Sequence, residues 1–179
     1  AELHTFVVLN LPVSDDFDVP GIFSSCLTLD GVGQEGTPIY ATGFIFGTKN
    51  MTLSNIIRWW NCSDTNLSLS MDYVHNICSN GWSLGTIGTT VFKDRVHLQP
   101  IFVPLCYSFT RTESSVPYVA AISQIMVIHH ATGTNIETIK QRIPLVQGDD
   151  AGAIKKAAKH VLNADFYGCY AHAVRAVAK

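Results

Sequence analysis

The decisive stretch of this sequence is residues 22–46, IFSSCLTLDGVGQEGTPIYATGFIF. Its two ends, Ile22–Leu29 and Pro38–Phe46, are rich in β-branched and aromatic side chains, which favour strands. The segment between them, Asp30–Thr37, holds three glycines and begins with the turn-forming pair Asp-Gly. A strand, a glycine-rich loop and a second strand in this order predict a β-hairpin.

Further segments outside this hairpin also have the composition of strands. They are Leu3–Leu11, Ser83–Phe109 and Ser123–His130. Pro100 and Pro104 interrupt the second of them, and a proline cannot donate a hydrogen bond to a strand ladder. We therefore expect an edge, a bulge or a break there, in place of one long central strand.

Helical spacing of apolar residues appears in two short segments. In Leu53–Asn61, apolar residues recur at i, i+3, i+4 and i+7, which is one helical face. In Thr134–Ile143, three isoleucines lie on one side of a predicted helix. Asp72–Cys78 fits a helical stripe or a buried segment equally well.

The clearest predicted helix lies near the C-terminus. Asp149 and Asp150 supply N-cap chemistry for it. An apolar stripe follows beside several lysines and is formed by Ile154, Ala158, Val161 and Leu162. Asn163–Asp165 predicts a break, after which we expect a second helix over Phe166–Ala178.

These elements predict an α+β fold in a single domain, residues 1–179. Residues 1–148 would form a β-rich body with short helices, built as a sandwich or a partly open barrel. Residues 149–179 would form a basic, helical C-terminal segment.

Charge is distributed unevenly along the chain. Residues 1–150 carry seven Lys and Arg against thirteen Asp and Glu, a net charge of −6, whereas residues 151–179 have a net charge of +4. A basic segment of this kind points to an anionic partner or to the acidic body of another copy. The residues expected to make this contact are Lys155, Lys156, Lys159, Arg175 and Lys179. The alternative is that they form the solvated side of an ordinary helix.

Arg58 and Trp59 form a second candidate interface. In a helix over Leu53–Asn61, Trp60 lies on the apolar face, whereas Trp59 lies off it. Trp and Arg are enriched at the positions that dominate binding energy in protein interfaces. We expect Arg58 and Trp59 to contact a protein, or else a base or a sugar.

Composition also bears on assembly and location. Hydrophobic residues make up 47% of the chain and charged residues 15%, a charge-poor composition that favours self-association. The five cysteines form no C-x-x-C pair and are odd in number, which indicates free thiols and an intracellular or virion location. The alternative is secretion, which is favoured by three N-x-S/T sequons at Asn50, Asn61 and Asn66.

Two patterns could indicate a bound cofactor or metal, and each has a plainer explanation. Residues 31–36, GVGQEG, match G-x-G-x-x-G, but the next residues predict a strand where a dinucleotide fold needs a helix. A hairpin loop explains this motif better. Cys62, His75 and Cys78 have the ligand chemistry of a zinc site but no recognised spacing, and buried cysteines explain them better. We therefore expect no cofactor and no metal.

Cys169 is the one candidate nucleophile. It lies in YGCY, residues 167–170, whose Gly-Cys-Tyr string resembles viral papain-like leader proteases. In those enzymes the catalytic His lies well downstream, and here only His172 follows. A buried structural cysteine is favoured, so we expect no enzymatic activity and keep a cysteine hydrolase as an alternative.

A charge-poor body rich in Ser, Thr and aromatic residues, followed by a short basic helical end, resembles the structural proteins of RNA viruses, either a matrix protein or a coat-protein domain. The resemblance implies a non-enzymatic protein that forms homo-oligomers and contacts a nucleocapsid, a nucleic acid or an anionic membrane surface. The first alternative is a secreted or surface β-rich glycoprotein module that binds carbohydrate or a receptor.

Overall fold

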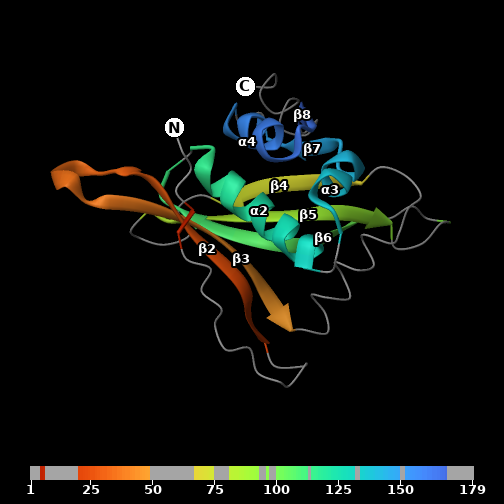
Figure 1. Cartoon of the computed structure of the whole chain (residues 1–179), viewed down its shortest axis with the longest axis horizontal. Coiled ribbons are helices and arrows are strands. Elements are labelled where there is room, and N and C mark those ends of the chain that lie inside the picture. Colours follow the sequence, from red (N-terminus) through yellow and green to blue (C-terminus); the bar gives the residue numbers. More distant parts are fainter. Residues whose placement is uncertain are drawn as a thin grey trace.

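One sheet organises the computed structural model of this chain (Figure 1). The structure describes residues 5–6, 20–48, 67–74, 81–92, 96, 100–112, 114–131, 134–149 and 152–168. All eight strands in these residues belong to the sheet, in the order β1-β2-β3-β6-β5-β4-β7-β8. Their bounds are β1 Thr5–Phe6, β2 Pro20–Val32, β3 Pro38–Thr48, β4 Ser68–Val74, β5 Ser83–Phe92, β6 Pro100–Thr110, β7 Leu145–Gly148 and β8 Asp165–Gly168.

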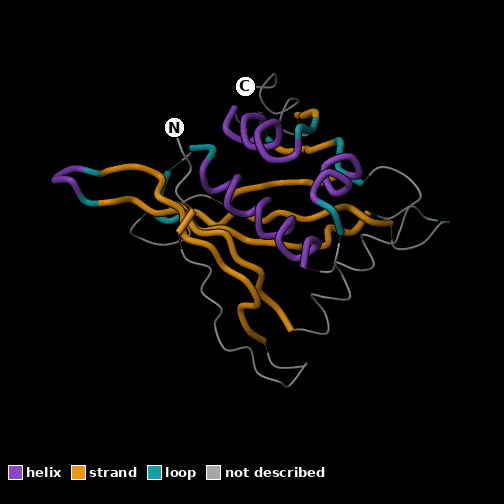
Figure 2. The backbone as a smooth tube through the Cα atoms, viewed as in Figure 1, coloured by secondary structure: helices purple, strands orange, loops and turns teal. Residues whose placement is uncertain are grey.

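The sheet curves into a half-barrel, and helices cover one of its faces (Figures 1 and 2). The helices of the described residues are α2 Val116–Ala131, α3 Ile136–Arg142 and α4 Gly152–Leu162. We call the helix-covered side the closed face and the other side the open face. The fold is α+β and β-rich, as predicted, and a single curved sheet corresponds to the partly open barrel and not to the sandwich.

The predicted hairpin is confirmed. β2 and β3 pair antiparallel up to Val32 and Pro38, and the turn contains a 3₁₀ segment, η1 Gln34–Gly36. The Gly33 N–H donates to the Thr37 carbonyl at 2.7 Å. Gly36 has φ 76°, a left-handed conformation that glycine adopts at little cost. The G-x-G-x-x-G motif is therefore the turn of a hairpin, whose tip reaches beyond the rest of the sheet (Figure 1).

The effect of the two prolines is also as predicted. Pro100 begins β6, and Pro104 lies at a register shift where Ile87 and Gly88 of β5 pair with Cys106 and Pro104. The extra residue at this bulge is Leu105. In the described residues β3 pairs with β6 only at 107–109, so both prolines lie where β6 has one neighbouring strand.

The strand expected over Ser123–His130 is wrong, because these residues lie in α2. This helix is apolar on nearly all sides, so its sequence lacks the periodicity that marks an amphipathic helix. Its start does carry a local signal. The Ser114 hydroxyl accepts from the Val116 N–H at 3.0 Å, and Pro117 occupies the first turn, where its missing N–H costs nothing. No helix within the described ranges has the length and hydropathy needed to cross a membrane.

Small residues let α2 pack directly onto the sheet. A Cβ on Gly43 of β3 would lie 2.7 Å from the backbone carbonyl of Ala120 in α2, closer than real side chains approach. The neighbouring positions on the closed face of β3, Ala41 and Ile45, are fully buried. The core between sheet and helices therefore depends on close backbone approach as well as on large apolar side chains.

The predicted helix Thr134–Ile143 is confirmed as α3. The side chain of Asn135 caps it by accepting from the Glu137 N–H at 2.8 Å. Two backbone carbonyls at the end of α3 and just before β7 connect this segment to neighbouring chain: the Arg142 carbonyl accepts from the Leu67 N–H at 2.7 Å, and the Pro144 carbonyl accepts from the Asp165 N–H at 2.8 Å.

The helix near the C-terminus is confirmed as α4, with its apolar stripe buried. It ends at Asn163, which has a left-handed φ of 57°: the Asn163 N–H donates to the Lys159 carbonyl at 3.2 Å, the bond of an αL C-cap, and the Ala164 N–H donates to the Ala158 carbonyl at 3.3 Å. The helix expected over Phe166–Ala178 is wrong where it is described, because residues 165–168 form β8, parallel to β7. The chain beside β7 gains a row of backbone hydrogen bonds that sequence periodicity does not encode.

Several sequence predictions fall on residues that the structure does not describe. The predicted helix Leu53–Asn61 lies outside the described residues. Of the strand Leu3–Leu11 only β1 is described, and of Asp72–Cys78 only the part in β4.

Candidate functional site

The open face carries the large aromatic side chains of β3 and β6. In β3, Phe44 and Phe46 alternate with the buried positions of the closed face. In β6, Tyr107 and Phe109 alternate with the small buried residues Cys106, Ser108 and Thr110. In these two strands the aromatic rings therefore lie on the open face, whereas the closed face carries mainly small side chains and the fully buried Ile45.

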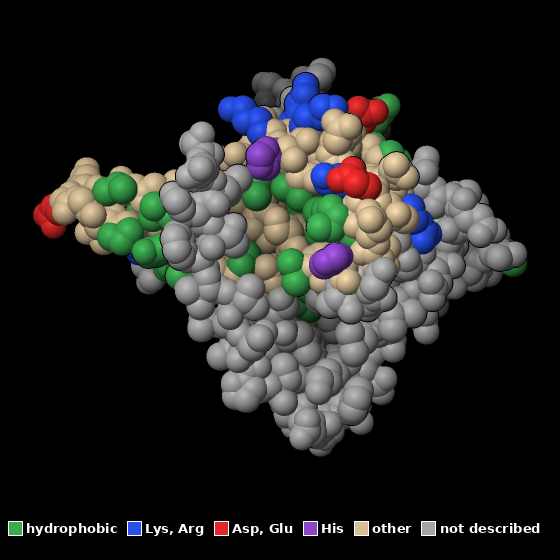
Figure 3. Space-filling model, viewed as in Figure 1, with side chains coloured by type: hydrophobic (Ala, Val, Ile, Leu, Met, Phe, Trp, Pro, Cys, Tyr) green, Lys and Arg blue, Asp and Glu red, His purple; other side chains and the backbone are tan. Residues whose placement is uncertain are grey.

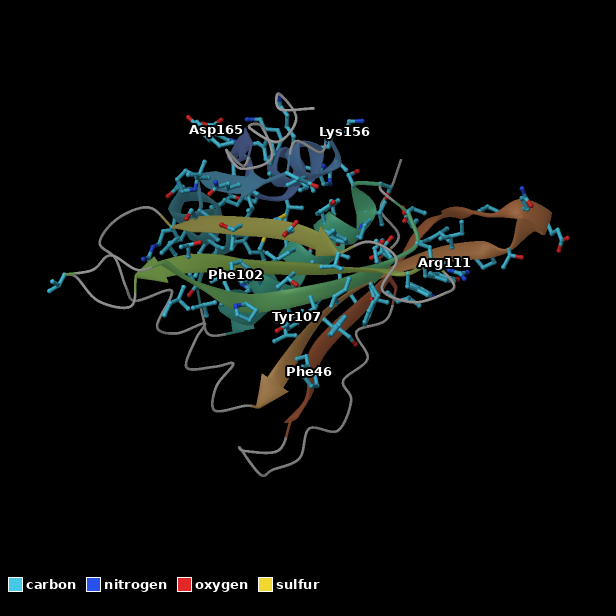
Figure 4. All side chains as sticks on the ribbon, turned by 180° about the vertical axis from the view of Figure 1, so that it is seen from behind. Phe46, Phe102, Tyr107, Arg111, Lys156 and Asp165 are labelled. Atoms are coloured by element: carbon cyan, nitrogen blue, oxygen red, sulfur yellow. The ribbon has the colours of Figure 1, made fainter. Side chains whose placement is uncertain are left out.

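The aromatic rings form a connected row that we call the aromatic ladder, consisting of Phe44, Tyr107, Phe109 and Trp82. Phe44 stacks on Tyr107 and on Phe109, with ring centroids 5.7 and 5.4 Å apart, and Trp82 meets Phe109 edge-on at 6.5 Å. The guanidinium of Arg111 lies 5.3 Å from the Trp82 ring centroid, a cation–π contact. Figure 4 looks onto this face and labels Tyr107, Arg111 and Phe46 there.

A cavity of about 480 Å³ lies beside the ladder, and we call it the acidic cavity. It has two carboxylates, Asp72 of β4 and Asp149 just after β7, whereas its described lining contains no Lys or Arg. The described residues around it are Ser70, Met71, Asp72, Val74, Thr86, Thr90, Phe102, Gln147, Gly148 and Asp149.

The two carboxylates differ in their surroundings. Asp72 is exposed, and its Oδ1 accepts from the Tyr73 N–H at 2.9 Å. The Oδ1 atom of Asp149 is buried and has no hydrogen-bond partner among the described residues. Burying such an atom without a partner costs about 1–3 kcal/mol.

Strand register joins the acidic cavity to the aromatic ladder. Asp72 lies opposite Thr86 on β5, Thr86 opposite Tyr107 on β6, and Tyr107 opposite Phe44 on β3. Because directly opposed residues point to the same face, this row runs from carboxylate to hydroxyl to aromatic ring. The open face therefore presents one continuous surface, acidic at one end and aromatic at the other.

The hairpin tip presents a second group of apolar side chains. We call Leu29–Tyr40 the arm. Within it Val32 is 66% exposed, Leu29 46% and Tyr40 40%, and Figure 3 shows hydrophobic side chains along this projection. At the base of the arm, the Asp30 carboxylate accepts from the hydroxyls of Thr112 and Ser114 and so connects the arm to the start of α2.

Three of the predicted contact residues are exposed side by side on α4. Lys155, Lys156 and Lys159 are exposed, whereas the opposite side of the helix is buried and consists of Ile154, Ala157, Ala158 and Leu162. Figure 3 shows the Lys and Arg colour gathered over this helix. Arg175 and Lys179, and the interface candidates Arg58 and Trp59, lie outside the described residues.

The two described cysteines, Cys26 and Cys106, are free and buried. Burial raises the pKa of both thiols, and the Sγ of Cys106 donates to the Phe44 carbonyl at 3.2 Å. A thiol with a raised pKa is a poor nucleophile at neutral pH, so both are structural. Burial likewise raises the pKa of Tyr73, whose hydroxyl hydrogen-bonds Ser108.

Within the described part of the chain, no group of three or more His, Cys, Asp or Glu is placed to hold a metal ion. The other residues considered for chemistry, Cys62, His75, Cys78, Cys169 and His172, lie outside the described residues, as do the asparagines of the three sequons.

The aromatic ladder and the acidic cavity were not predicted from the sequence. The ladder has a local signal: in residues 41–46 and 106–110, aromatic residues alternate with small ones at a period of two. The sequence carries no local signal for the acidic cavity, because Asp72 and Asp149 are far apart in the sequence and are brought together by the parallel pairing of β4 with β7.

No protein-family model matches this chain, and no match is found among curated proteins or solved structures.

Proposed function

We propose that this protein is a non-enzymatic, self-assembling structural protein. The observation that carries the proposal is the arm, a projecting hairpin whose apolar side chains at Leu29, Val32 and Tyr40 are 40–66% exposed. Grouped apolar side chains on a projection lose water only when another surface covers them. The charge-poor composition supports a second copy of the chain as that surface.

The specific form of the proposal is a matrix protein or coat-protein domain of an RNA virus, with an intracellular or virion location. Its support is the composition and the basic side of α4. In this form, the exposed Lys155, Lys156 and Lys159 contact a nucleocapsid, a nucleic acid, an anionic membrane surface or the acidic body of a neighbour.

The arm provides the direct test. Val32→Ser combined with Tyr40→Thr removes two of the three exposed large apolar side chains of the arm, and the threonine at position 40 remains compatible with a strand. We expect the wild-type protein to form concentration-dependent oligomers and the double variant to be monomeric, as measured by size-exclusion chromatography with light scattering. Both should melt at the same temperature.

The matched control is Val127→Ser, which removes an apolar side chain that is 47% exposed on α2, away from the arm. This variant should assemble as the wild type does. A wild-type protein that stays monomeric at every concentration would overturn the proposal, as would equal assembly by the arm variant.

A second candidate function is carbohydrate binding. It is favoured by the aromatic ladder, whose rings lie in one row with the hydroxyl of Thr86 and the carboxylate of Asp72. Aromatic rings pack on sugar faces while hydroxyls and carboxylates bond to sugar hydroxyls. Calorimetric titration with oligosaccharides tests it: binding that is lost in Tyr107→Ala, with no oligomer formed by the wild type, would replace the assembly proposal.

A further inference from the structure

We propose that the acidic cavity receives a lysine side chain from α4 of a second copy, so that copies join head to tail. This inference rests on the proposed self-assembly and names one of its contacts. The juxtaposition that carries it is a cavity with two carboxylates on the open face and a row of exposed lysines on a helix of the closed face.

The acidic cavity has the chemistry that a lysine side chain needs. An ammonium group has three donors and no acceptor, and the cavity offers the carboxylates of Asp72 and Asp149. The aliphatic stem of a lysine can lie along Phe102 and Val74, which are 43% and 59% exposed. A volume of about 480 Å³ accommodates a side chain of this length.

Asp149 is the second carboxylate residue that lines the cavity. Its Oδ1 atom has no partner in the described part of the chain, although it is shielded from solvent. An ammonium arriving in the cavity would place a positive charge against a lining whose described residues include two acids and no Lys or Arg.

The lysines of α4 are available to bind in the cavity of a second copy. Lys155 and Lys159 are one helical turn apart on the same side of α4, with Lys156 next to them. Among the described residues none of the three forms an ion pair, in contrast to Lys140, whose Nζ lies 2.9 Å from the Glu137 carboxylate. Their exposed position allows them to reach beyond the surface of their own molecule.

The positions of the two sites favour contact between copies. α4 packs on the closed face through its buried stripe, whereas Asp72 and Val74 alternate with buried residues of β4 and so point to the open face. The donor and acceptor surfaces therefore lie on different sides of one molecule. A contact between unlike surfaces is heterologous and propagates into rings or open arrays.

The test reverses the charge on each side separately. Asp72→Lys places a cation in the cavity, and Lys155→Glu/Lys156→Glu/Lys159→Glu makes the α4 row acidic. We expect the self-association constant of each variant alone to fall by about tenfold or more. When the two are mixed, each cavity meets an α4 of opposite charge, so assembly should return to near the wild-type level.

Matched controls carry the same charge changes elsewhere. Asp165→Lys reverses an exposed carboxylate on β8, outside the described lining of the cavity, and Lys140→Glu reverses a lysine of α3. Both should assemble as the wild type does. Circular dichroism melts identify any variant that fails to fold, and Asp72→Asn then replaces Asp72→Lys, with a smaller loss expected.

The outcomes separate this inference from the proposed function. If the charge variants assemble like the wild type while the arm variant is monomeric, the lysine contact is wrong and self-assembly stands. If mixing fails to restore assembly, the two sites do not meet, and the contact is again wrong. If the wild-type protein is monomeric throughout, both proposals fail.

Discussion

The closed and open faces of the sheet are formed by the same strands and differ in almost every physical property. On the closed face, Ile45 and Ile87 are fully buried beneath the helices, and Gly43 allows the backbone of α2 to approach. On the open face, Phe46 and Phe102 remain 48% and 43% exposed. The side chain at position 43 is therefore limited by the close approach of α2, whereas Ile45 and Ile87 are large side chains on the same buried face.

Where the backbone of α2 comes closest, at Gly43, there is no room for a larger side chain, and the aromatic rings of β3 and β6 lie on the other side of the sheet. The closed face should therefore carry the stability of the fold, and the open face its contacts. Substitutions on the two faces test whether stability and contacts are divided in this way.

The largest change in the free energy of unfolding is expected from substitutions on the closed face. Ile122→Ala removes a fully buried side chain of α2 and should lower the free energy of unfolding by about 2–5 kcal/mol, because the site is left with a cavity. Urea denaturation measures this loss. Val127→Ala, at a position that is 47% exposed on the same helix, should change it by no more than about 0.5 kcal/mol. Equal losses in the two variants would contradict a core on this face.

An intermediate loss of folding stability is expected at alkaline pH. Burial holds the pKa of Cys106 above its ordinary value of 9.0, with a further contribution from Cys26. Above pH 9 the unfolded chain loses this proton while the folded chain retains it. Stability that is complete below pH 9 is therefore lost as the pH rises, by about 1.4 kcal/mol per pH unit for this group.

Urea denaturation at several pH values from about 8 to 10 tests this sign. Cys106→Ala should show a shallower loss of stability than the wild type over that range. Identical slopes would mean that the thiol of Cys106 ionises as easily in the folded protein as in the unfolded one.

The smallest change in the free energy of unfolding is expected from substitutions on the open face. Phe46→Thr exchanges an exposed aromatic residue for another good strand former, so the free energy of unfolding should change by no more than about 0.5 kcal/mol. Phe44→Thr should cost more, because the Phe44 ring stacks on both Tyr107 and Phe109. Thermal melts of the Phe46→Thr and Phe44→Thr variants measure both changes. A large loss of stability in Phe46→Thr would show that the open face also stabilises the fold.

Elements with a local cause could be predicted from the sequence. The glycine-rich turn between β2 and β3, the Asn135 cap of α3, the end of α4 at Asn163 and the bulge at Pro104 each depend on a residue type that restricts the backbone at that point. The exposed lysines of α4 follow from the same local periodicity.

Elements that depend on their neighbours were not predicted correctly. α2 was mistaken for a strand because a helix covered by the sheet and by α4 needs no polar side, and β8 was mistaken for a helix because its strand conformation comes from pairing with β7. The acidic cavity likewise requires β4 and β7 to be adjacent.

By itself the sequence determined the hairpin, the two amphipathic helices, the basic side of α4 and a β-rich α+β fold, because turn chemistry and helical periodicity act over a few residues. Tertiary contacts were needed to place the aromatic rings of β3 and β6 on the open face and to bring Asp72 and Asp149 to one cavity. They were also needed for the chain after α4 to form a strand. These features depend on contacts between residues far apart in the sequence, and burial and backbone pairing override local preference there.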